Sequence, residues 1–158
     1  MKISLLAVGK VRGPIADGIR EYEQRIRHYF AFDVVEVKET SASGGRTPAE
    51  VMESEGARLL AKVPEGFELV ALHRKGIAWS SDRLARHIEL LGVNSRPGMA
   101  LMIGGAFGLA PAVLDRADRL LSLSSMTLPH ELARLVVTEQ IYRAGTILRG
   151  EPYHKATR

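Results

Sequence analysis

The sequence predicts an α/β protein with a mostly parallel sheet of five to six strands and helices on both faces. Short apolar runs of strand length alternate along the chain with segments of helical apolar spacing, as in strands joined by crossover helices. The chain has 158 residues, of which 46% are hydrophobic, and this is enough for a single buried core. No internal repeat interrupts the alternation, so we expect residues 1–158 to form one domain.

The first strand is expected from Ile3 to Gly9, an apolar run that stops at glycine and is too short for a signal peptide. Pro14 then fits the first turn of a helix, where its missing N–H costs nothing. Apolar side chains recur along this helix with the spacing of one buried face, at Ile15, Ile19, Tyr22, Ile26 and Tyr29.

Residues 32–39 alternate apolar and charged side chains, which predicts a strand near an edge of the sheet. The loop that follows, TSASGGR, is flexible by composition; it is either a plain surface loop or one that contacts a phosphate backbone. Thr47 and Glu50 then form a capping box with Pro48 at the first helical position, which indicates a sharp helix start.

The remaining strands are expected at 67–72, 98–103 and 119–124, and the first of these is apolar enough to be central. Ser80 or Ser81 can cap a helix before the fourth strand, and a short helix starts near Pro111. The third strand ends at the basic turn HRKG, the fourth at Gly104 and the fifth at the turn MTLPHE. Because the carboxyl ends of parallel strands share one edge, we expect the ligand site there.

The last helix, expected from Pro129 to Arg149, carries apolar residues over more than one face. A helix that is apolar over so much of its girth needs burial from two sides. One side can be the sheet of the same chain and the other a second copy. We therefore predict a homodimer packed partly through this helix.

Composition excludes some kinds of site and leaves the partner open. The chain has no cysteine, which excludes disulfides and thiolate metal sites and is typical of the cytoplasm. Its histidines lack metal-ligand spacing, and we expect no metal. The net charge of +4 fits an anionic partner such as RNA and equally fits ordinary surface lysines and arginines. No stretch predicts a membrane span.

Two segments draw attention as candidate sites. GGAFG after the fourth strand is neither a dinucleotide fingerprint nor a P-loop, and glycines at a strand end are most often turns. In the tail RGEPYHKATR, where proline is expected to end the helix, Tyr153 can stack on a base, His154 can move a proton and Lys155 can hold an anion. Composition alone favours a frayed terminus for this tail.

Taken together, these segments resemble the RlmH family, the pseudouridine methyltransferases of the large ribosomal subunit within the SPOUT superfamily. The similarity runs through AVGK, EYEQRIRHY, LMIGGAFGL, SLSSMTLPHELARLVVTEQIYRA and RGEPYHK, and hence the whole chain. The resemblance implies methyl transfer from S-adenosyl-L-methionine to N3 of a pseudouridine in 23S rRNA on the assembled 70S ribosome. It also implies a homodimer and a C-terminal trefoil knot, which topology rules alone would not predict.

The resemblance also assigns roles to residues. Cofactor binding falls on Leu72, Gly104, Leu123, Ser124, Ser125, Met126, Thr127 and Leu128. Tyr153, His154 and Lys155 match the substrate-side motif, with His154 as base or orienting group and Lys155 favouring the anion.

The chain departs from its relatives at two places: Phe107 stands where they often carry an acid, and Ala156-Thr157-Arg158 extends beyond their usual end. Two other functions compete with methyl transfer. One is a noncatalytic ribosome-binding factor, which would have no cofactor affinity. The other is a small-molecule nucleotide enzyme, which would not depend on ribosomes. Neither accounts as well for TLPH and PYHK in one chain.

Overall fold

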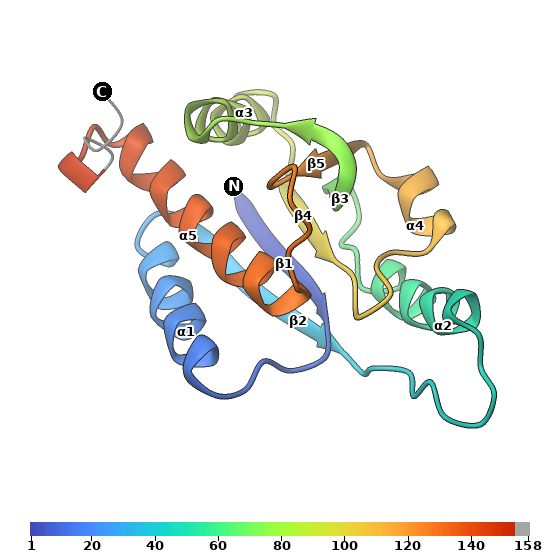
Figure 1. The fold of residues 1–158 in the computed structure, drawn as a ribbon. Helices are drawn as coiled ribbons and strands as arrows, with labels where there is room; N and C mark the ends of the chain where they lie inside the picture. The colour runs from blue at the N-terminus through green and yellow to red at the C-terminus, as the bar shows by residue number, and fades with distance from the viewer. Residues whose placement is uncertain (154–158) are drawn as a thin grey trace.

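The computed structural model describes residues 1–153, and its centre is a parallel sheet in the strand order β2-β1-β4-β3-β5 (Figure 1). The α/β prediction is confirmed, and all five strands found in the described chain are parallel. The strands are β1 (Lys2–Val8), β2 (Ala31–Val37), β3 (Glu68–Ala78), β4 (Gly98–Ile103) and β5 (Arg119–Ser122).

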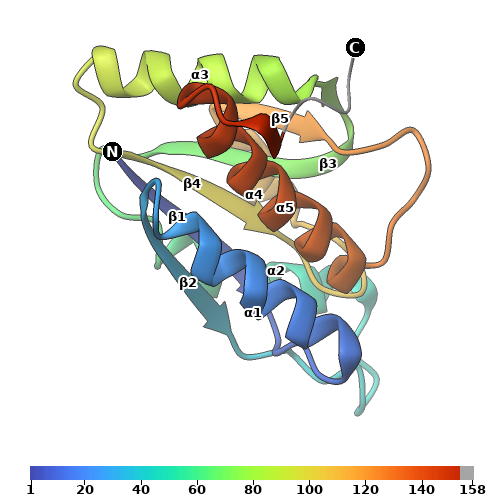
Figure 2. The ribbon, with the colours of Figure 1, turned by 90° about the vertical axis from the view of Figure 1, so that its left-hand side faces the viewer.

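Helices cover both faces of the sheet, as the sequence predicts (Figures 1 and 2). One face carries α1, α3 and α5, and the opposite face carries α2 and α4. None of the helices within residues 1–153 is long and apolar enough to cross a membrane. The helices are α1 (Pro14–Ile26), α2 (Pro48–Leu60), α3 (Ser81–Val93), α4 (Pro111–Arg116) and α5 (His130–Leu148).

Apart from the buried Ser4, β1 is apolar on both faces from Ile3 to Val8, because each face packs against a different core. Leu5 belongs to the cluster shared with α1, α3 and α5, whereas Leu6 belongs to the cluster shared with α2 and α4. Both leucines are fully buried. A parallel strand covered on both sides has no face for polar side chains, so the alternation seen in β2 is absent here.

Two local predictions are confirmed at the start of the sheet. The half-polar strand β2 lies at the edge, paired only with β1. The capping box is present: the Glu50 amide donates to the Thr47 hydroxyl, and the Thr47 amide donates to the Glu50 carboxylate at 2.7 Å. That backbone hydrogen bond is the main reason why the pKa of Glu50 lies below its usual value.

The third strand is longer than the sequence predicts. It does not end at Leu72 but continues to Ala78, and the basic segment 73–76 forms a bulge within it. Leu72 and Ile77 both pair with Leu121 of β5, so the chain leaves the ladder and rejoins it. This detour holds the basic segment beside the carboxyl end of β5.

Helix α5 lies between α1 and α3 on the sheet, which Figure 2 shows clearly. Its buried apolar side chains, Val137, Ile141 and Ala144, belong to the core of this face. The two flanking helices cover much of the wide apolar arc, so the arc by itself does not require a second copy. Leu132 and Leu148 remain exposed.

The end of α5 corrects one interpretation of the tail. Proline was expected to stop the helix, yet the stop is made by Gly150, whose φ of 66° reverses the chain. The Gly150 amide donates to the Ile147 carbonyl at 3.0 Å and the Glu151 amide donates to the Thr146 carbonyl at 2.9 Å. These two bonds form a Schellman motif, and Pro152 comes only afterwards.

Candidate cofactor site

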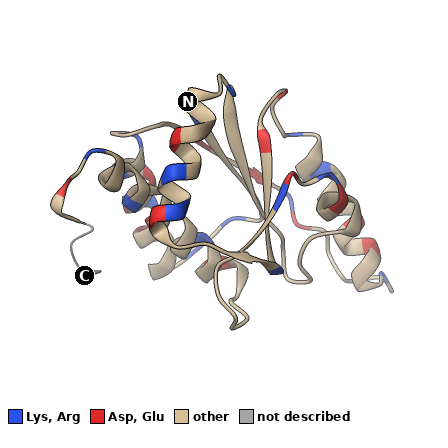
Figure 3. Cartoon of the chain, turned by 90° about the horizontal axis from the view of Figure 1, so that it is seen from above, with Lys and Arg blue, Asp and Glu red and all other residues tan. Residues whose placement is uncertain are grey.

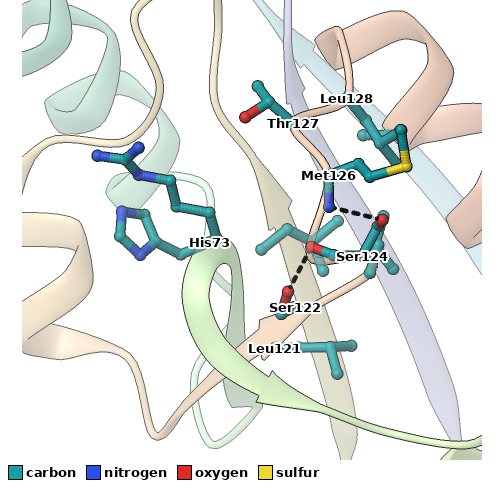
Figure 4. A pocket seen from close by; sticks show the side chains of 11 residues that line it. His73, Leu121, Ser122, Ser124, Met126, Thr127 and Leu128 are labelled. Carbon is teal, nitrogen blue, oxygen red and sulfur yellow. Dashed lines mark hydrogen bonds between the residues drawn. The ribbon is translucent and has the colours of Figure 1, made fainter.

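A cavity of about 200 Å³ opens beside the bulge of β3, where β5 ends and α5 begins (Figure 4). It lies at the carboxyl edge of the sheet, where the sequence places the ligand site. Its lining combines apolar side chains with hydroxyl groups and two basic residues. The lining residues are Leu72, His73, Arg74, Leu121, Ser122, Leu123, Ser124, Met126, Thr127, Leu128 and Ala133.

Six of the eight predicted cofactor residues line this cavity: Leu72, Leu123, Ser124, Met126, Thr127 and Leu128. Gly104 and Ser125 are not among the lining residues. The backbone itself requires glycine at position 104, because a Cβ atom there would lie 2.5 Å from the backbone carbon of Gly108. This requirement comes from the tight turn that follows β4. Phe107, in that turn, is 45% exposed and also lies outside the lining.

The loop after β5 is shaped by its own serines. The Ser122 hydroxyl donates to the Ser124 carbonyl at 2.9 Å, and the Ser124 hydroxyl accepts from the Met126 amide at the same distance (Figure 4). These bonds hold the loop in a turn at the mouth of the cavity. Met126 is 76% exposed there, so its flexible apolar side chain is free to cover a bound group.

His73 and Arg74 line the cavity but were not among the predicted site residues. The pKa of His73 is lowered, first by burial and then by the charges of Arg74 and Lys75. The Lys75 amide also donates to His73 Nδ1 at 3.2 Å, which requires that nitrogen to be unprotonated. His73 is thus a neutral acceptor near neutral pH. The expected position of the HRKG turn at this edge was the signal that could have identified both residues.

Tyr153, the first of the three candidate residues in the tail, is packed against helices rather than free. The Tyr153 hydroxyl donates to Glu139 Oε1 at 3.0 Å, and its ring meets that of Tyr142 edge-on at 4.8 Å. Arg143 lies 4.9 Å from the ring centre. Burial, the Tyr22 hydroxyl and Glu139 raise the pKa of Tyr153, so the phenol stays protonated. His154 and Lys155, the two catalytic candidates, lie outside the described residues.

Tyr153 and the cavity occupy different sides of α5. Tyr153 lies near Tyr22 of α1, whereas the cavity adjoins β3 and β5 and meets the helix at Ala133. The ring of Tyr153 packs on Tyr142 of this helix. From Ala133 to Tyr142 the helix rises by roughly 14 Å, at about 1.5 Å per residue. Within one protomer, the start of the tail therefore does not reach the cavity.

Comparisons with known proteins agree with this architecture. The family model described as predicted SPOUT methyltransferase matches residues 1–154. The chain is 48% identical to the ribosomal RNA large subunit methyltransferase H of Gemmatimonas aurantiaca, covering 98% of this chain and 100% of that one. It is 45% identical to the protein of that name from Syntrophotalea carbinolica, covering 98% and 99%.

A solved structure shares the fold at low sequence identity. It is described as a probable methyltransferase from Bordetella pertussis Tohama I, with a TM-score of 0.55 and 13% identity over 90% of this chain and 95% of that one. The family resemblance drawn from the sequence motifs is confirmed by the matches over the full chain. The chain therefore belongs to the SPOUT methyltransferases, within the family of ribosomal RNA large subunit methyltransferase H.

Proposed function

We propose that this chain transfers the methyl group of S-adenosyl-L-methionine to N3 of a pseudouridine in 23S rRNA, on the assembled 70S ribosome. The observation that carries the proposal is the cavity built by the β5 end and the TLPH loop, in a chain that matches this family from end to end. A ribosomal substrate requires the protein to act in the cytoplasm.

The cavity residues suit this cofactor. Leu72, Leu123 and Leu128 offer apolar surface for an adenine ring, and the loop backbone offers groups for its polar edge. Arg74 supplies a cation for the carboxylate of the methionine part. The neutral state of His73 avoids a second positive charge beside the sulfonium. When bound, the cofactor supplies a methyl group made electrophilic by the positive sulfur.

The tail supplies the proton chemistry in this proposal. The N3–H of pseudouridine is a weakly acidic imide, so its proton must leave in or before the transition state. We assign its removal, or the orientation of the ring, to His154, and we assign stabilisation of the resulting anion to Lys155. N3 then forms the new bond to the methyl carbon while the carbon–sulfur bond breaks. A general base typically contributes about 10² to 10⁴ in rate.

We further propose a homodimer in which the tail of one subunit completes the cavity of the other. Exposed Leu132 and Leu148 on α5 are available for such an interface, and Tyr153 lies on the α1 side of its own helix, away from its own cavity. Sedimentation at micromolar concentration tests the association: a dimer is expected, and a monomer would contradict it.

We also propose the trefoil knot of the superfamily. Strand β5 lies at one edge of the sheet, yet the chain returns to place α5 between α1 and α3, so the loop after β5 must cross the strand ends. Forming a knot requires the C-terminus to pass through a loop. Refolding should therefore become several-fold slower when a stably folded domain is fused to the C-terminus. An unchanged refolding rate would count against the knot.

The activity is tested with labelled S-adenosyl-L-methionine and three substrates from cells that lack the modification: intact 70S ribosomes, 50S subunits and naked 23S rRNA. Labelling confined to 70S particles is expected, because a protein of this size has little surface for reading RNA sequence and must rely on shape. No labelling of any substrate, together with no cofactor binding, would instead favour a noncatalytic ribosome-binding factor.

A further inference from the structure

A second hollow, of about 410 Å³, lies between α3 and the start of β5 and shares no lining residue with the cofactor cavity. Its chemically distinctive lining residues are Trp79, Arg83, Arg86, His87 and Arg119. We call it the Trp79 groove. Trp79 is the only tryptophan of the chain. The clustering of arginines at this groove is a local feature. Elsewhere Lys and Arg are distributed over several elements and interleaved with Asp and Glu (Figure 3).

The floor of the Trp79 groove is held by a buried carboxylate. The Glu68 side chain is only 6% exposed, and its two oxygens contact His87 Nε2 and Arg119 Nε, the latter at 2.8 Å. The His87 ring in turn lies 4.8 Å from the Trp79 ring. The aromatic side chain and Arg119 are thus fixed by one network before any ligand arrives, which lowers the entropy lost on binding.

The Trp79 groove has more basic than acidic side chains, and two of its arginines have no carboxylate partner in the described part of the chain. Within residues 1–153, the guanidinium groups of Arg83 and Arg86 form no ion pair, and Arg119 uses only Nε on Glu68. Asp82 is the one exposed acid in the lining. Four other arginines are paired with carboxylates, whereas Arg83 and Arg86 are not among the described residues; the paired residues are Arg20, Arg25, Arg134 and Arg143. The groove therefore presents cationic forks suited to phosphate oxygens.

An aromatic face beside unpaired arginines is the arrangement that single-stranded nucleic acid uses, with a base on the ring and its phosphates on the guanidiniums. Arg83 lies 5.1 Å over the Trp79 ring and is exposed, so it can move to a phosphate and leave that face to a base. A peptide made only of acidic residues would satisfy the arginines but would have no partner for the ring.

The Trp79 groove also adjoins the cofactor cavity. A smaller cavity of about 150 Å³ shares Trp79 with the groove and shares Leu121, Ser122 and Leu123 with the cofactor cavity. Arg119 and Ser122 are separated by one short strand, roughly 10 Å at about 3.3 Å per residue. A nucleotide held in the groove would therefore lie next to one presented to the cofactor.

We propose that the Trp79 groove binds a single-stranded rRNA nucleotide that neighbours the methylation target, with its base against Trp79 and its phosphates on Arg83 and Arg86. This inference rests on the proposed function, because it takes rRNA as the partner. It assigns to α3 and β5 a role in holding substrate that the cofactor cavity does not provide.

The single tryptophan allows a direct test. Titration with a short single-stranded RNA, a uridine-rich hexanucleotide, should quench the tryptophan fluorescence as a base stacks on Trp79, and added salt should reverse the quenching. A polyaspartate peptide at matched charge serves as the control and should leave the fluorescence unchanged. The inference is overturned if saturating RNA causes no quenching or if polyaspartate quenches equally.

A second test uses exposed arginines whose replacement does not disturb the core. For R83Q/R86Q, the slope of log affinity against log salt should fall by about 1.4, because each phosphate contact on a single strand contributes about 0.7. The KM for 70S ribosomes should rise roughly tenfold with kcat unchanged. R116Q, which removes one positive charge from α4 outside the groove, is the control and should retain the wild-type slope and KM.

A third pair of variants isolates the ring. W79F keeps an aromatic face and should retain the KM for ribosomes, whereas W79L should raise it; equal KM values for the two would overturn the stacking contact. The outcomes also separate this inference from the proposed function. If the wild type methylates ribosomes and R83Q/R86Q does so with the same KM, the role of the groove is refuted and the proposed function stands. Failure of the wild type to methylate any ribosomal substrate refutes the proposed function, on which the groove depends.

Discussion

At the scale of single residues, His73 links charge to cofactor binding. Its pKa is held below the usual value of about 6.5 by burial first and by Arg74 and Lys75 next. The residue is therefore neutral at pH 7 and becomes cationic only as the pH falls below its unfolded value. Since S-adenosyl-L-methionine carries a positive sulfur, protonation of His73 should oppose its binding.

Calorimetric titration of the cofactor from pH 7.5 downward should show a constant affinity to about pH 6.5 and a several-fold fall at lower pH, because the pKa of His73 lies below that value. H73Q should flatten this dependence, because no proton can then be taken up. The same shift means that the unfolded chain binds more protons in this window, so wild-type stability should rise with pH there. A pH profile of cofactor affinity identical in H73Q and wild type would refute the role of His73.

Tyr153 offers a second prediction at this scale. Y153F removes the hydroxyl that donates to Glu139 and also contacts the Tyr22 hydroxyl at 3.4 Å. Because Glu139 also accepts from Arg143, the variant should lower the free energy of unfolding by only about 1 kcal/mol. Y153A also removes the packing on Tyr142 and should release the tail. Urea denaturation measures the first effect. For the second, kcat should fall much further in Y153A than in Y153F, with cofactor affinity unchanged; equal kcat values would contradict tail anchoring.

At the scale of elements, local signals were predictable and non-local ones were not. Strand β4 was predicted at its observed bounds, 98–103, and the capping box at Thr47 is present, because both depend on neighbours in sequence. The extension of β3 past Leu72 depends on pairing with β5, almost fifty residues later in the chain, which no local pattern reports. The cover over α5 likewise comes from α1 and α3.

The candidate site follows the same division. The apolar and hydroxyl residues of the loop after β5 were predicted, because motif and strand end coincide there. The assignment of Gly104 to the cofactor stays a prediction, and only the folded turn reveals that the backbone of Gly108 also requires glycine at this position. His73 enters the lining because the β3 bulge carries it there. Propensity within the segment contains no information about that detour.

Helix α5 also carries a buried charge, and the effect of its removal on stability can be predicted. Arg134 donates to Glu36 at 2.8 Å and to Glu23 at 3.1 Å, and its side chain is 6% exposed. R134A would leave two acids without their partner and should destabilise the fold by roughly 3 kcal/mol. Chemical denaturation measures the change, with R116Q, at an exposed position of α4, as control. A loss no larger than that of the control would mean that solvent already screens the cluster.

At the scale of the whole molecule, the position of Tyr153 relative to the cavity argues for a site shared between subunits. If the tail acts in trans, a cofactor-site variant and a tail variant each fail alone, but together they form one intact site. L123R places a cation in the cavity lining, and H154A removes the proposed base. Equal mixing through unfolding and refolding should restore about a quarter of the wild-type methyl transfer, because about half the dimers are mixed and each has one complete site.

The two parent variants, refolded separately and then combined without exchange, provide the control and should remain inactive. Methyl transfer at the background level in the mixed sample, with mixed dimers demonstrated by native mass spectrometry, would contradict sharing. The tail would then have to reach its own cavity around α5, from a Tyr153 that is packed beside α1 and tied to Glu139. That route would require the contacts of Tyr153 to break during turnover, so Y153A would then increase kcat rather than reduce it.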